Sequence, residues 1–211
     1  MHMKKHRART GKSTKRGLRV AARAKLPTRF GLFQILGIEG GTPAESAVAL
    51  VHGRVRGATP VVRIHSQCFT GDVLASQRCD CRAQLELSLR RISKASAGVL
   101  LYLPQEGRGI GLMNKLRAYQ LQDRGMDTVE ANEQLGFPAD ARSYRFSAEA
   151  LRLLGVRRVR LLSNNPDKVK QLEAAGIRVI ERLPCRPRSV HTSRDYLETK
   201  RTKMGHVLGR R

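Results

Sequence analysis

Short runs of apolar residues, separated by turn residues, fill the first third of the chain. Three such runs occupy residues 30–38, 46–55 and 59–66, with the sequences FGLFQILGI, SAVALVHGRV and TPVVRIHS. Apolar runs of this length, bounded by Gly and Pro, are typical of β-strands. We therefore predict a small antiparallel sheet in the N-terminal half of the chain.

After Cys81 the apolar residues recur at the spacing of an α-helix, so we predict an amphipathic helix that ends near Gly98. The residues that set this spacing are Leu85, Leu89 and Ile92. The unbroken apolar run at 99–103 follows, and it predicts a strand buried on both faces. A second helix is predicted over residues 110–125. Its apolar face carries Leu112, Leu116 and Tyr119.

The last predicted elements alternate between helix and strand. Ser147 is a candidate N-cap for a helix that stops at Gly155, and Asn165 with Pro166 predicts the start of a further helix. The intervening and following strands are expected at 159–163 and 177–181. Such alternation indicates βαβ units. We therefore predict an α/β (α+β) fold, in which the small antiparallel sheet is followed by strands and helices around a mostly parallel or mixed sheet.

The composition excludes several classes of protein. The chain has 211 residues, of which 40% are hydrophobic, so it is neither disordered nor fibrous. No apolar run approaches the roughly 20 residues of a membrane span, and no apolar region follows the basic N-terminus as in a secretory signal. Four cysteines are too few for a disulfide scaffold. We expect a cytoplasmic protein whose clustered cysteines serve as metal ligands or catalysts.

The charge is strongly positive and unevenly placed. The chain has 41 Lys and Arg residues against 17 Asp and Glu residues, a net charge of +24 at pH 7, and its first acidic residue is Glu39. Such a surplus attracts anions, whether nucleotide phosphates or nucleic acid. We interpret residues 1–23 as a basic, disordered arm and residues 207–211 as a basic tail. Tethering of RNA or DNA by the arm is the alternative.

Three of the four cysteines fall within one polar segment, RIHSQCFTGDVLASQRCDC. Cys68, Cys79 and Cys81 have the spacing C-x10-C-x-C, and three thiolates form a soft, negative ligand set that suits Zn²⁺. Three protein ligands leave a fourth position open for water, as in catalytic zinc sites. Two alternatives stay open: ordinary buried cysteines, or a closed site completed by Cys185 or His65.

Two polar strand ends are candidates for binding phosphate. QEGRGIG at 105–111 lies between the predicted buried strand and the next helix, where backbone N–H groups can cradle phosphate and Arg108 adds a bidentate fork. The alternative is a tight turn with a salt bridge between Glu106 and Arg108. The second strand end, SNNPDK at 163–168, offers Lys168. Together the two ends would form a pocket at the carboxyl edge of the sheet.

Taken together, three segments strongly resemble GTP cyclohydrolase II, the first enzyme of riboflavin biosynthesis. They are RIHSQCFTGDVLASQRCDC, LPQEGRGIGLMNKLRAYQLQDRGMDTVEANEQLGFPADAR and LLSNNPDKVKQLEAAGI. The resemblance runs from about Ala24 to His206, so we expect residues 24–206 to form the catalytic domain. It implies an enzyme that opens the imidazole ring of GTP at C8 and releases formate and pyrophosphate. The implied product is 2,5-diamino-6-ribosylamino-4(3H)-pyrimidinone 5′-phosphate. The implied cofactors are one Zn²⁺ per chain and Mg²⁺, and the implied assembly is a homodimer.

The resemblance also assigns site residues. The three clustered cysteines would bind zinc, whose water attacks C8. Asp140 and Arg142 match the pair assigned as proton acceptor and nucleophile, with a charge-stabilising role for Arg142 as the alternative. Tyr119 matches a tyrosine near the ring chemistry, with packing as its alternative. The residues that match nucleotide contacts are Arg63, Ile64, His65, Ser66, Gln67, Gln84, Glu106, Gly107, Arg108, Thr128, Ser163 and Lys168.

Two other functions remain open from the sequence. One is a paralogue that retains the formyl group or the pyrophosphate. The other is a nucleic-acid-binding protein that has reused the fold, motivated by the net charge of +24. The presence of Tyr119, Asp140 and Arg142 favours the full reaction.

Overall fold

Within the residues that the computed structural model describes, 17–42 and 45–187, seven strands form one mixed sheet surrounded by helices. The strands are β1 (Arg19–Thr28), β2 (Gly31–Glu39), β3 (Ser46–Gly53), β4 (Val61–Ser66), β5 (Ala97–Leu103), β6 (Arg158–Leu162) and β7 (Arg178–Leu183). The helices are α1 (Cys81–Ser93), α2 (Leu112–Gln122), α3 (Thr128–Gln134), α4 (Arg145–Leu153) and α5 (Pro166–Ala174). Two short turns precede α1 and α2: the π-helical η1 (Phe69–Val73) and the 3-10 helical η2 (Glu106–Gly109).

The sheet has an antiparallel half and a parallel half. Its strand order is β1-β2-β3-β5-β4-β6-β7, antiparallel from β1 to β5 and parallel from β5 to β7. The predicted α+β fold with a mixed sheet is confirmed. The placement of residues 59–66 in the antiparallel part is wrong, because β4 pairs in parallel with β5 and β6. The crossover through α1 reverses the chain between β4 and β5, as a parallel pair requires.

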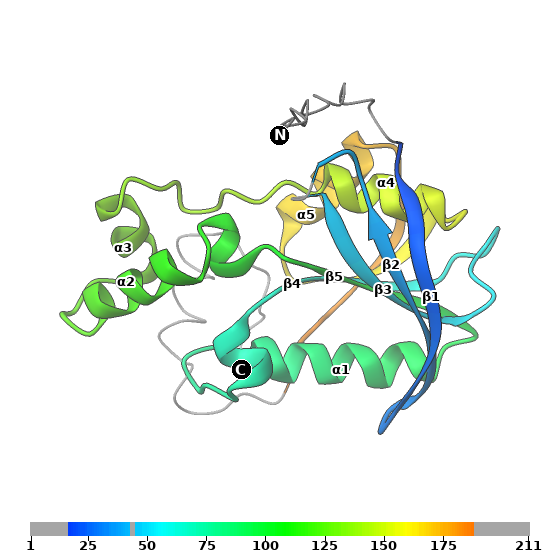
Figure 1. Ribbon diagram of the computed structural model, residues 1–211, viewed down its shortest axis with the longest axis horizontal. Coiled ribbons are helices and arrows are strands. Elements are labelled where there is room, and N and C mark those ends of the chain that lie inside the picture. Colours follow the sequence, from blue (N-terminus) through cyan, green and yellow to red (C-terminus); the bar gives the residue numbers. More distant parts are fainter. Residues whose placement is uncertain (1–16, 43–44, 188–211) are drawn as a thin grey trace, which may run out of the picture.

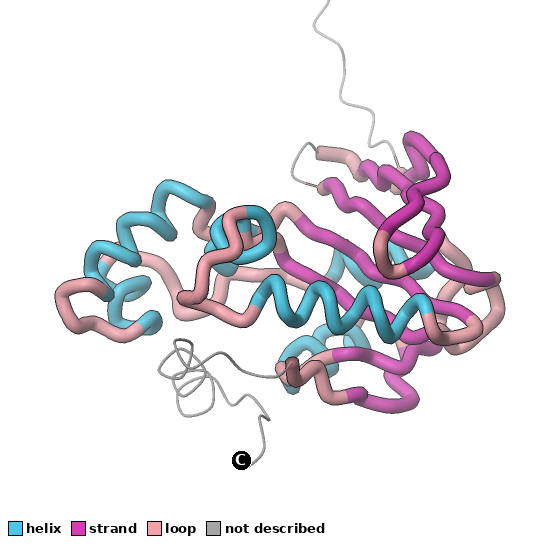
Figure 2. Tube along the Cα trace, turned by 90° about the horizontal axis from the view of Figure 1, so that it is seen from below, coloured by secondary structure: helices cyan, strands magenta, loops and turns pink. Residues whose placement is uncertain are grey.

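Helices cover both faces of the sheet (Figure 1). α1 packs across one face against β5, β4 and β2, while α4 and α5 lie on the opposite face. α2 and α3 lie beyond the end of the parallel strands, as the view turned by 90° also shows (Figure 2). Among the described residues, no helix has the length and apolar character needed to cross a bilayer.

Two apolar clusters hold these layers together, and β5 contributes to both. Leu100 packs with Leu89 and Ile92 on the face covered by α1, whereas Leu101 packs with Leu151 on the face covered by α4 and α5. Successive side chains of a strand point to opposite faces of its sheet. The prediction of a strand buried on both faces at 99–103 is therefore confirmed.

The folded domain begins earlier than predicted. The interpretation of residues 1–23 as a disordered arm is wrong from Arg19 onward, because β1 begins there and Arg19 forms an ion pair with Glu39 at 2.6 Å. β1 supplies hydrogen-bond partners to an edge of β2 that would otherwise be unpaired. Residues 1–16 and the predicted tail at 207–211 lie outside the described residues.

The two predicted helix starts have different outcomes. Asn165 caps α5 as predicted, since its side-chain oxygen accepts a hydrogen bond from the backbone N–H of Asp167 at 2.9 Å. Ser147 is not an N-cap, because α4 already begins at Arg145. Ser147 instead lies fully buried within the helix.

The helix predicted over 110–125 is shorter than expected. Gly111 has a φ of 83°, a left-handed conformation that separates α2 from the glycine-rich turn. Gly111 is nevertheless the N-cap of α2, so the turn at 105–111 leads directly into a helix N-terminus, as the sequence predicts. The predicted apolar face is also only partly correct, since Leu116 is 41% exposed and Ala118 is buried instead. Because α2 lies off the sheet, no layer of the described residues covers Leu116 fully.

Gly53, at the end of β3, is a position where a side chain should be strongly destabilising. Its φ is 68°, and a Cβ there would lie 2.1 Å from the carbonyl oxygen of Ser96. We expect Gly53→Ala to lower the free energy of unfolding by about 3 kcal/mol, measured by urea denaturation. Gly57 is the matched control, because its φ is 77° but a Cβ would meet nothing within 4 Å. Gly57→Ala should cost only about 1 kcal/mol, and equal losses would contradict the steric argument.

Candidate active site

A pocket lies at the carboxyl edge of the parallel strands. Because β4, β5 and β6 run in the same direction, the segments that follow them meet at one end of the sheet. These segments line the pocket together with residues of α1, α2 and α3. The predicted pocket between the two polar strand ends is therefore present. Its polar and charged lining includes Arg63, His65, Ser66, Gln67, Cys68, Cys79, Cys81, Gln84, Glu106, Arg108, Lys115, Tyr119, Thr128, Arg142, Ser163 and Lys168.

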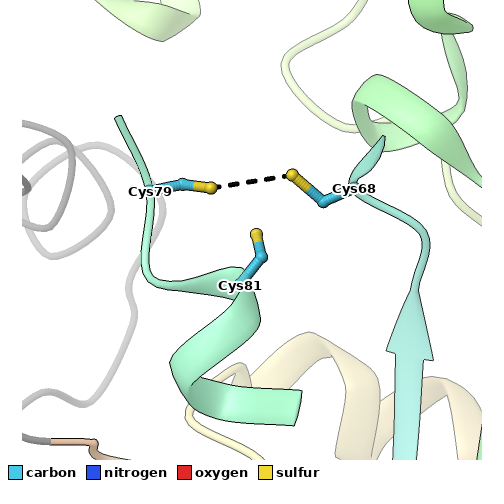
Figure 3. A group of neighbouring side chains, drawn as sticks. All are labelled: Cys68, Cys79 and Cys81. Carbon is cyan, nitrogen blue, oxygen red and sulfur yellow. Dashed lines mark hydrogen bonds between the residues drawn. The ribbon is translucent and has the colours of Figure 1, made fainter. Parts of the chain in front are cut away.

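The three clustered cysteines meet on one wall of this pocket (Figure 3). Cys68 follows β4, Cys79 lies in the loop before α1, and Cys81 is the first residue of α1. Their sulfur atoms all lie within 4.8 Å of one another, and those of Cys68 and Cys79 are 3.6 Å apart. The η1 turn folds back the chain that follows Cys68, so that the cysteine sulfur atoms come together.

The neighbours of Cys185 and His65 argue against a closed metal site. The Cys185 sulfur lies 3.7 Å from Oγ of Ser88 and 4.0 Å from the carbonyl oxygen of Gln84. His65 Nε2 lies 3.1 and 3.2 Å from the two carboxylate oxygens of Asp72. Neither residue belongs to the cluster, which among the described residues holds three cysteines.

The arrangement of the three thiols fits a zinc ion. Gly71 packs against them, and a Cβ on it would lie only 2.8 Å from Sγ of Cys79 and 3.1 Å from Sγ of Cys68, so a side chain at this position would displace the sulfur atoms. Hydrogen bonds from Cys79 and Cys81, with the nearby Lys115 ammonium, lower the pKa of the Cys68 thiol. Its hydrogen bond to Cys68 raises the pKa of Cys79 to about 11, and the pKa of Cys81 rises for the same reason. Thiols that share protons in this way release them when a soft metal binds.

The glycine-rich turn is built around Glu106. Gly107 and Arg108 have φ angles of 59° and 62°, so the backbone takes a left-handed course. The Glu106 carboxylate accepts hydrogen bonds from the backbone N–H groups of Phe69 at 2.6 Å and Gly107 at 3.1 Å, and from Lys115 Nζ at 2.7 Å. Its salt bridge is with Lys115, so the alternative of a Glu106–Arg108 pair is wrong. Both carboxylate oxygens are committed to the protein.

Asp140 and Arg142 form an ion pair beside this turn. Nε and Nη2 of Arg142 donate to the two carboxylate oxygens at 2.8 and 2.5 Å, and Nη1 lies 3.5 Å from Oγ of Ser66. Arg108 fixes the same loop by donating to the carbonyl oxygen of Ala139 at 3.1 Å. Burial raises the pKa of Asp140, but the hydrogen bonds and charge of Arg142 outweigh it and hold that pKa below its usual value. The carboxylate is therefore ionised at neutral pH.

Two buried basic side chains, Arg63 and Lys168, also line the pocket. Arg63 donates to the carbonyl oxygen of Leu162 at 3.1 Å and to Oε1 of Gln84 at 2.6 Å. Lys168 donates to the carbonyl oxygen of Ile64 at 2.9 Å. Burial, with the charge of Arg63, lowers the pKa of Lys168 well below its usual value. A bound polyanion would stabilise the charged form of this amine.

Of the remaining candidate residues, Tyr119 and Thr128 line the pocket, whereas Ile64 lies in the core. The side chain of Ile64 is fully buried in the hydrophobic core, so it cannot contact a nucleotide in the pocket. Tyr119 lines the pocket, with its hydroxyl 3.2 Å from Oγ1 of Thr70 and the Arg78 guanidinium 4.8 Å from its ring centre. Burial raises the pKa of Tyr119, so its hydroxyl stays protonated. Thr128, the first residue of α3, also lines the pocket.

Three polar residues that hold the site together were not among the predicted site residues. Lys115 bridges to Glu106, and Asp72 accepts a hydrogen bond from Tyr102 at 2.9 Å. Gln105 accepts a hydrogen bond from Ser66 at 3.1 Å. Asp72 and Gln105 lie within the polar segments that the sequence singles out. Lys115 has no local signal, because its partner becomes a neighbour only when α2 folds back on the turn.

The Asp140–Arg142 pair should make stability depend on pH in the acid range. A carboxyl with a lowered pKa in the folded state contributes stability above its unfolded pKa, and loses it as pH falls through the folded pKa. Denaturation at pH 6 and pH 3 should therefore show a loss for Asp140→Asn at pH 6 that shrinks at pH 3. Glu149→Gln, in an exposed pair with Arg145, is the control and should cost less than about 0.5 kcal/mol at either pH. A loss for Asp140→Asn that is equal at both pH values would contradict the assignment.

Comparisons with known proteins agree on one family. The family model for GTP cyclohydrolase II matches residues 19–184. The GTP cyclohydrolase-2 of Citrobacter koseri is 53% identical over 194 residues, covering 92% of this chain and 99% of its own. That of Proteus mirabilis is 54% identical over 192 residues, covering 90% and 96%. A solved structure, RibBX, a two-domain 3,4-dihydroxy-2-butanone 4-phosphate synthase from A. baumannii, aligns over 81% of this chain and 41% of its own at 20% identity. Its TM-score is 0.44, too low to establish a common fold.

Proposed function

The chain belongs to the GTP cyclohydrolase II family, and on this premise we propose that it converts GTP in the first step of riboflavin biosynthesis. The reaction opens the imidazole ring at C8 and releases formate and pyrophosphate. Its product is 2,5-diamino-6-ribosylamino-4(3H)-pyrimidinone 5′-phosphate. The two named relatives are matched over nearly their whole length, 99% and 96%, by this chain.

One observation carries this proposal: a single pocket holds a three-cysteine cluster and several cations. The three cysteines line it together with the basic residues Arg63, Arg78, Arg108, Lys115, Arg142 and Lys168. A purine nucleoside triphosphate needs both features, since its ring requires activation and its phosphates require positive partners. This excess of basic side chains favours a negatively charged substrate over an uncharged one.

We propose that Cys68, Cys79 and Cys81 hold one zinc ion per chain. When bound, zinc supplies a Lewis acid that activates water near neutral pH, which the poorly electrophilic C8 of a purine requires. The cysteines lie within one segment of the chain, and the turn η1 and the start of α1 bring their sulfur atoms within 4.8 Å of one another. The protonated hydroxyl of Tyr119, on the same side of the pocket, can donate a hydrogen bond to the opening ring.

Arg142 is proposed to act as a clamp on the phosphates. Its bidentate pair with Asp140 fixes the guanidinium and leaves Nη1 directed toward Ser66. Use of Arg142 as a nucleophile would first require transfer of its proton to Asp140. Between a guanidinium pKa of roughly 12.5 and a carboxyl pKa of roughly 4, this transfer would cost about 12 kcal/mol. The clamp therefore fits the ground-state geometry better.

The remaining cofactor and partner are also proposals. We propose that Mg²⁺ accompanies the triphosphate, held mainly by phosphate oxygens, because Glu106 and Asp140 are committed to protein partners. We propose a homodimer, supported by the exposed apolar side chains of Met113 and Leu116 on α2. We propose that the enzyme works in the cytoplasm, where GTP is available.

The test is incubation of the full-length protein with GTP, Zn²⁺ and Mg²⁺, followed by mass spectrometry of all products. Formate and pyrophosphate should appear in equal amounts with the pyrimidinone monophosphate. A formylated or still triphosphorylated product would identify a paralogue that stops early. No turnover of GTP by metal-loaded protein would refute the proposed function.

A further inference from the structure

Lys115 connects the cysteine cluster to the glycine-rich turn, although no step described above uses it. Its side chain is only 11% exposed, and its Nζ donates to Oε1 of Glu106 at 2.7 Å and to Sγ of Cys68 at 3.1 Å. A buried ion pair gains little net stability, because the attraction is offset by the loss of hydration. Stability alone therefore does not account for this pair.

The contacts around Lys115 fix Cys68 from both its side chain and its backbone. Lys115 holds the sulfur, while Oε2 of Glu106 accepts a hydrogen bond from the N–H of Phe69, the next residue, at 2.6 Å. Asp72 accepts a hydrogen bond from the N–H of Cys68 itself at 3.0 Å. Charged side chains therefore hold Cys68 at both its sulfur and its backbone.

We propose that Lys115 is a positioning residue for the metal site, one that hydrogen-bonds the Cys68 thiolate and reduces the electron donation of this sulfur to the bound ion. This inference rests on the proposed zinc site. Three thiolates around a divalent cation leave a net negative charge, and an ammonium 3.1 Å from one sulfur offsets it. An ion that receives less charge from its ligands is a stronger Lewis acid. Lys115 thereby links the folding of α2 to the reactivity of the metal.

A competing role for Lys115 is direct contact with substrate. It lines the pocket, and an ammonium has three N–H groups, of which Cys68 and Glu106 occupy two. The two roles differ in the absence of GTP. A contact with substrate leaves the empty metal site unchanged, whereas a hydrogen bond to the thiolate alters it.

The test uses full-length protein loaded with Co²⁺ in place of zinc, without GTP. Removal of the hydrogen bond should make the Cys68 thiolate a better electron donor. Lys115→Met should therefore shift the thiolate-to-cobalt absorption band to longer wavelength. Because this variant also loses the contact that holds the Cys68 sulfur in place, zinc affinity should fall about 10- to 100-fold in competition with a chelator. Lys115→Arg keeps a charged donor and should restore most of the band position. Arg117→Met, an exposed residue on the same helix, should change neither quantity.

The outcomes separate this inference from the proposed function. An unmoved band in Lys115→Met would overturn the inference, even if the KM for GTP rises. A wild-type protein that shows no thiolate-to-cobalt band would refute the zinc site itself. If Lys115→Met does not fold, as judged by circular dichroism, Lys115→Gln takes its place, with a smaller expected shift because a neutral donor remains.

Discussion

Cys79→Ser is expected to abolish both metal binding and the release of formate from GTP. The Cys79 sulfur lies 3.6 Å from that of Cys68, and serine offers a harder and less acidic ligand than a thiol. Since a bound metal contributes several kcal/mol to the activation of water, formate release should fall by about a thousandfold or more. Zinc content by elemental analysis and formate release by mass spectrometry measure the two effects.

The matched control is Cys185→Ser. Cys185 is also fully buried, but its sulfur faces Ser88 and the carbonyl oxygen of Gln84. This variant should keep about one zinc per chain and most of its activity. Loss of zinc from Cys185→Ser as complete as from Cys79→Ser would mean that the site is closed and structural.

Substitution of Arg142 should separate the two halves of the reaction. Arg142→Ala removes a guanidinium that forms a bidentate pair with Asp140. Loss of such a buried charge contact typically costs about 2–5 kcal/mol, so pyrophosphate release should fall roughly 30- to 5,000-fold. Formate release should suffer less, because it depends on the cysteine wall of the pocket. Formate and pyrophosphate must be quantified separately, since a measurement of the final pyrimidine alone would not show which of the two steps is impaired.

Arg142→Lys distinguishes a clamp from a nucleophile. Lysine keeps the positive charge without the guanidinium geometry, so a clamp should retain pyrophosphate release within about tenfold of the wild type. A nucleophile should lose it as fully as in Arg142→Ala. Detection of a guanylylated Arg142 after rapid quenching of the wild-type enzyme would also contradict the clamp.

The sequence determined most of the elements and the residue types of the candidate metal site. Apolar runs and turn residues locate strands such as β2 and β5, because burial of alternate or all side chains leaves a pattern that is local in the chain. The cap at Asn165 is equally local, since the side chain bonds a backbone group two residues away. The three cysteines of the segment from Cys68 to Cys81 are also recognisable as candidate ligands from the sequence, because they lie close together in the chain. The family motifs extend this to the candidate nucleotide contacts.

Tertiary structure alone decided how these pieces meet. The parallel pairing of β4 depends on α1 crossing over to β5, and the strand β1 forms only because an edge of β2 is available to it. The sequence offered Arg108, a near neighbour, as an alternative partner for Glu106, yet Glu106 pairs with Lys115 on α2. Hydrogen bonds and ion pairs between distant segments leave no periodic trace, because each partner needs only the right chemical type at its own position. The network that holds Cys68 could therefore be found only once the folded backbone had placed its members together.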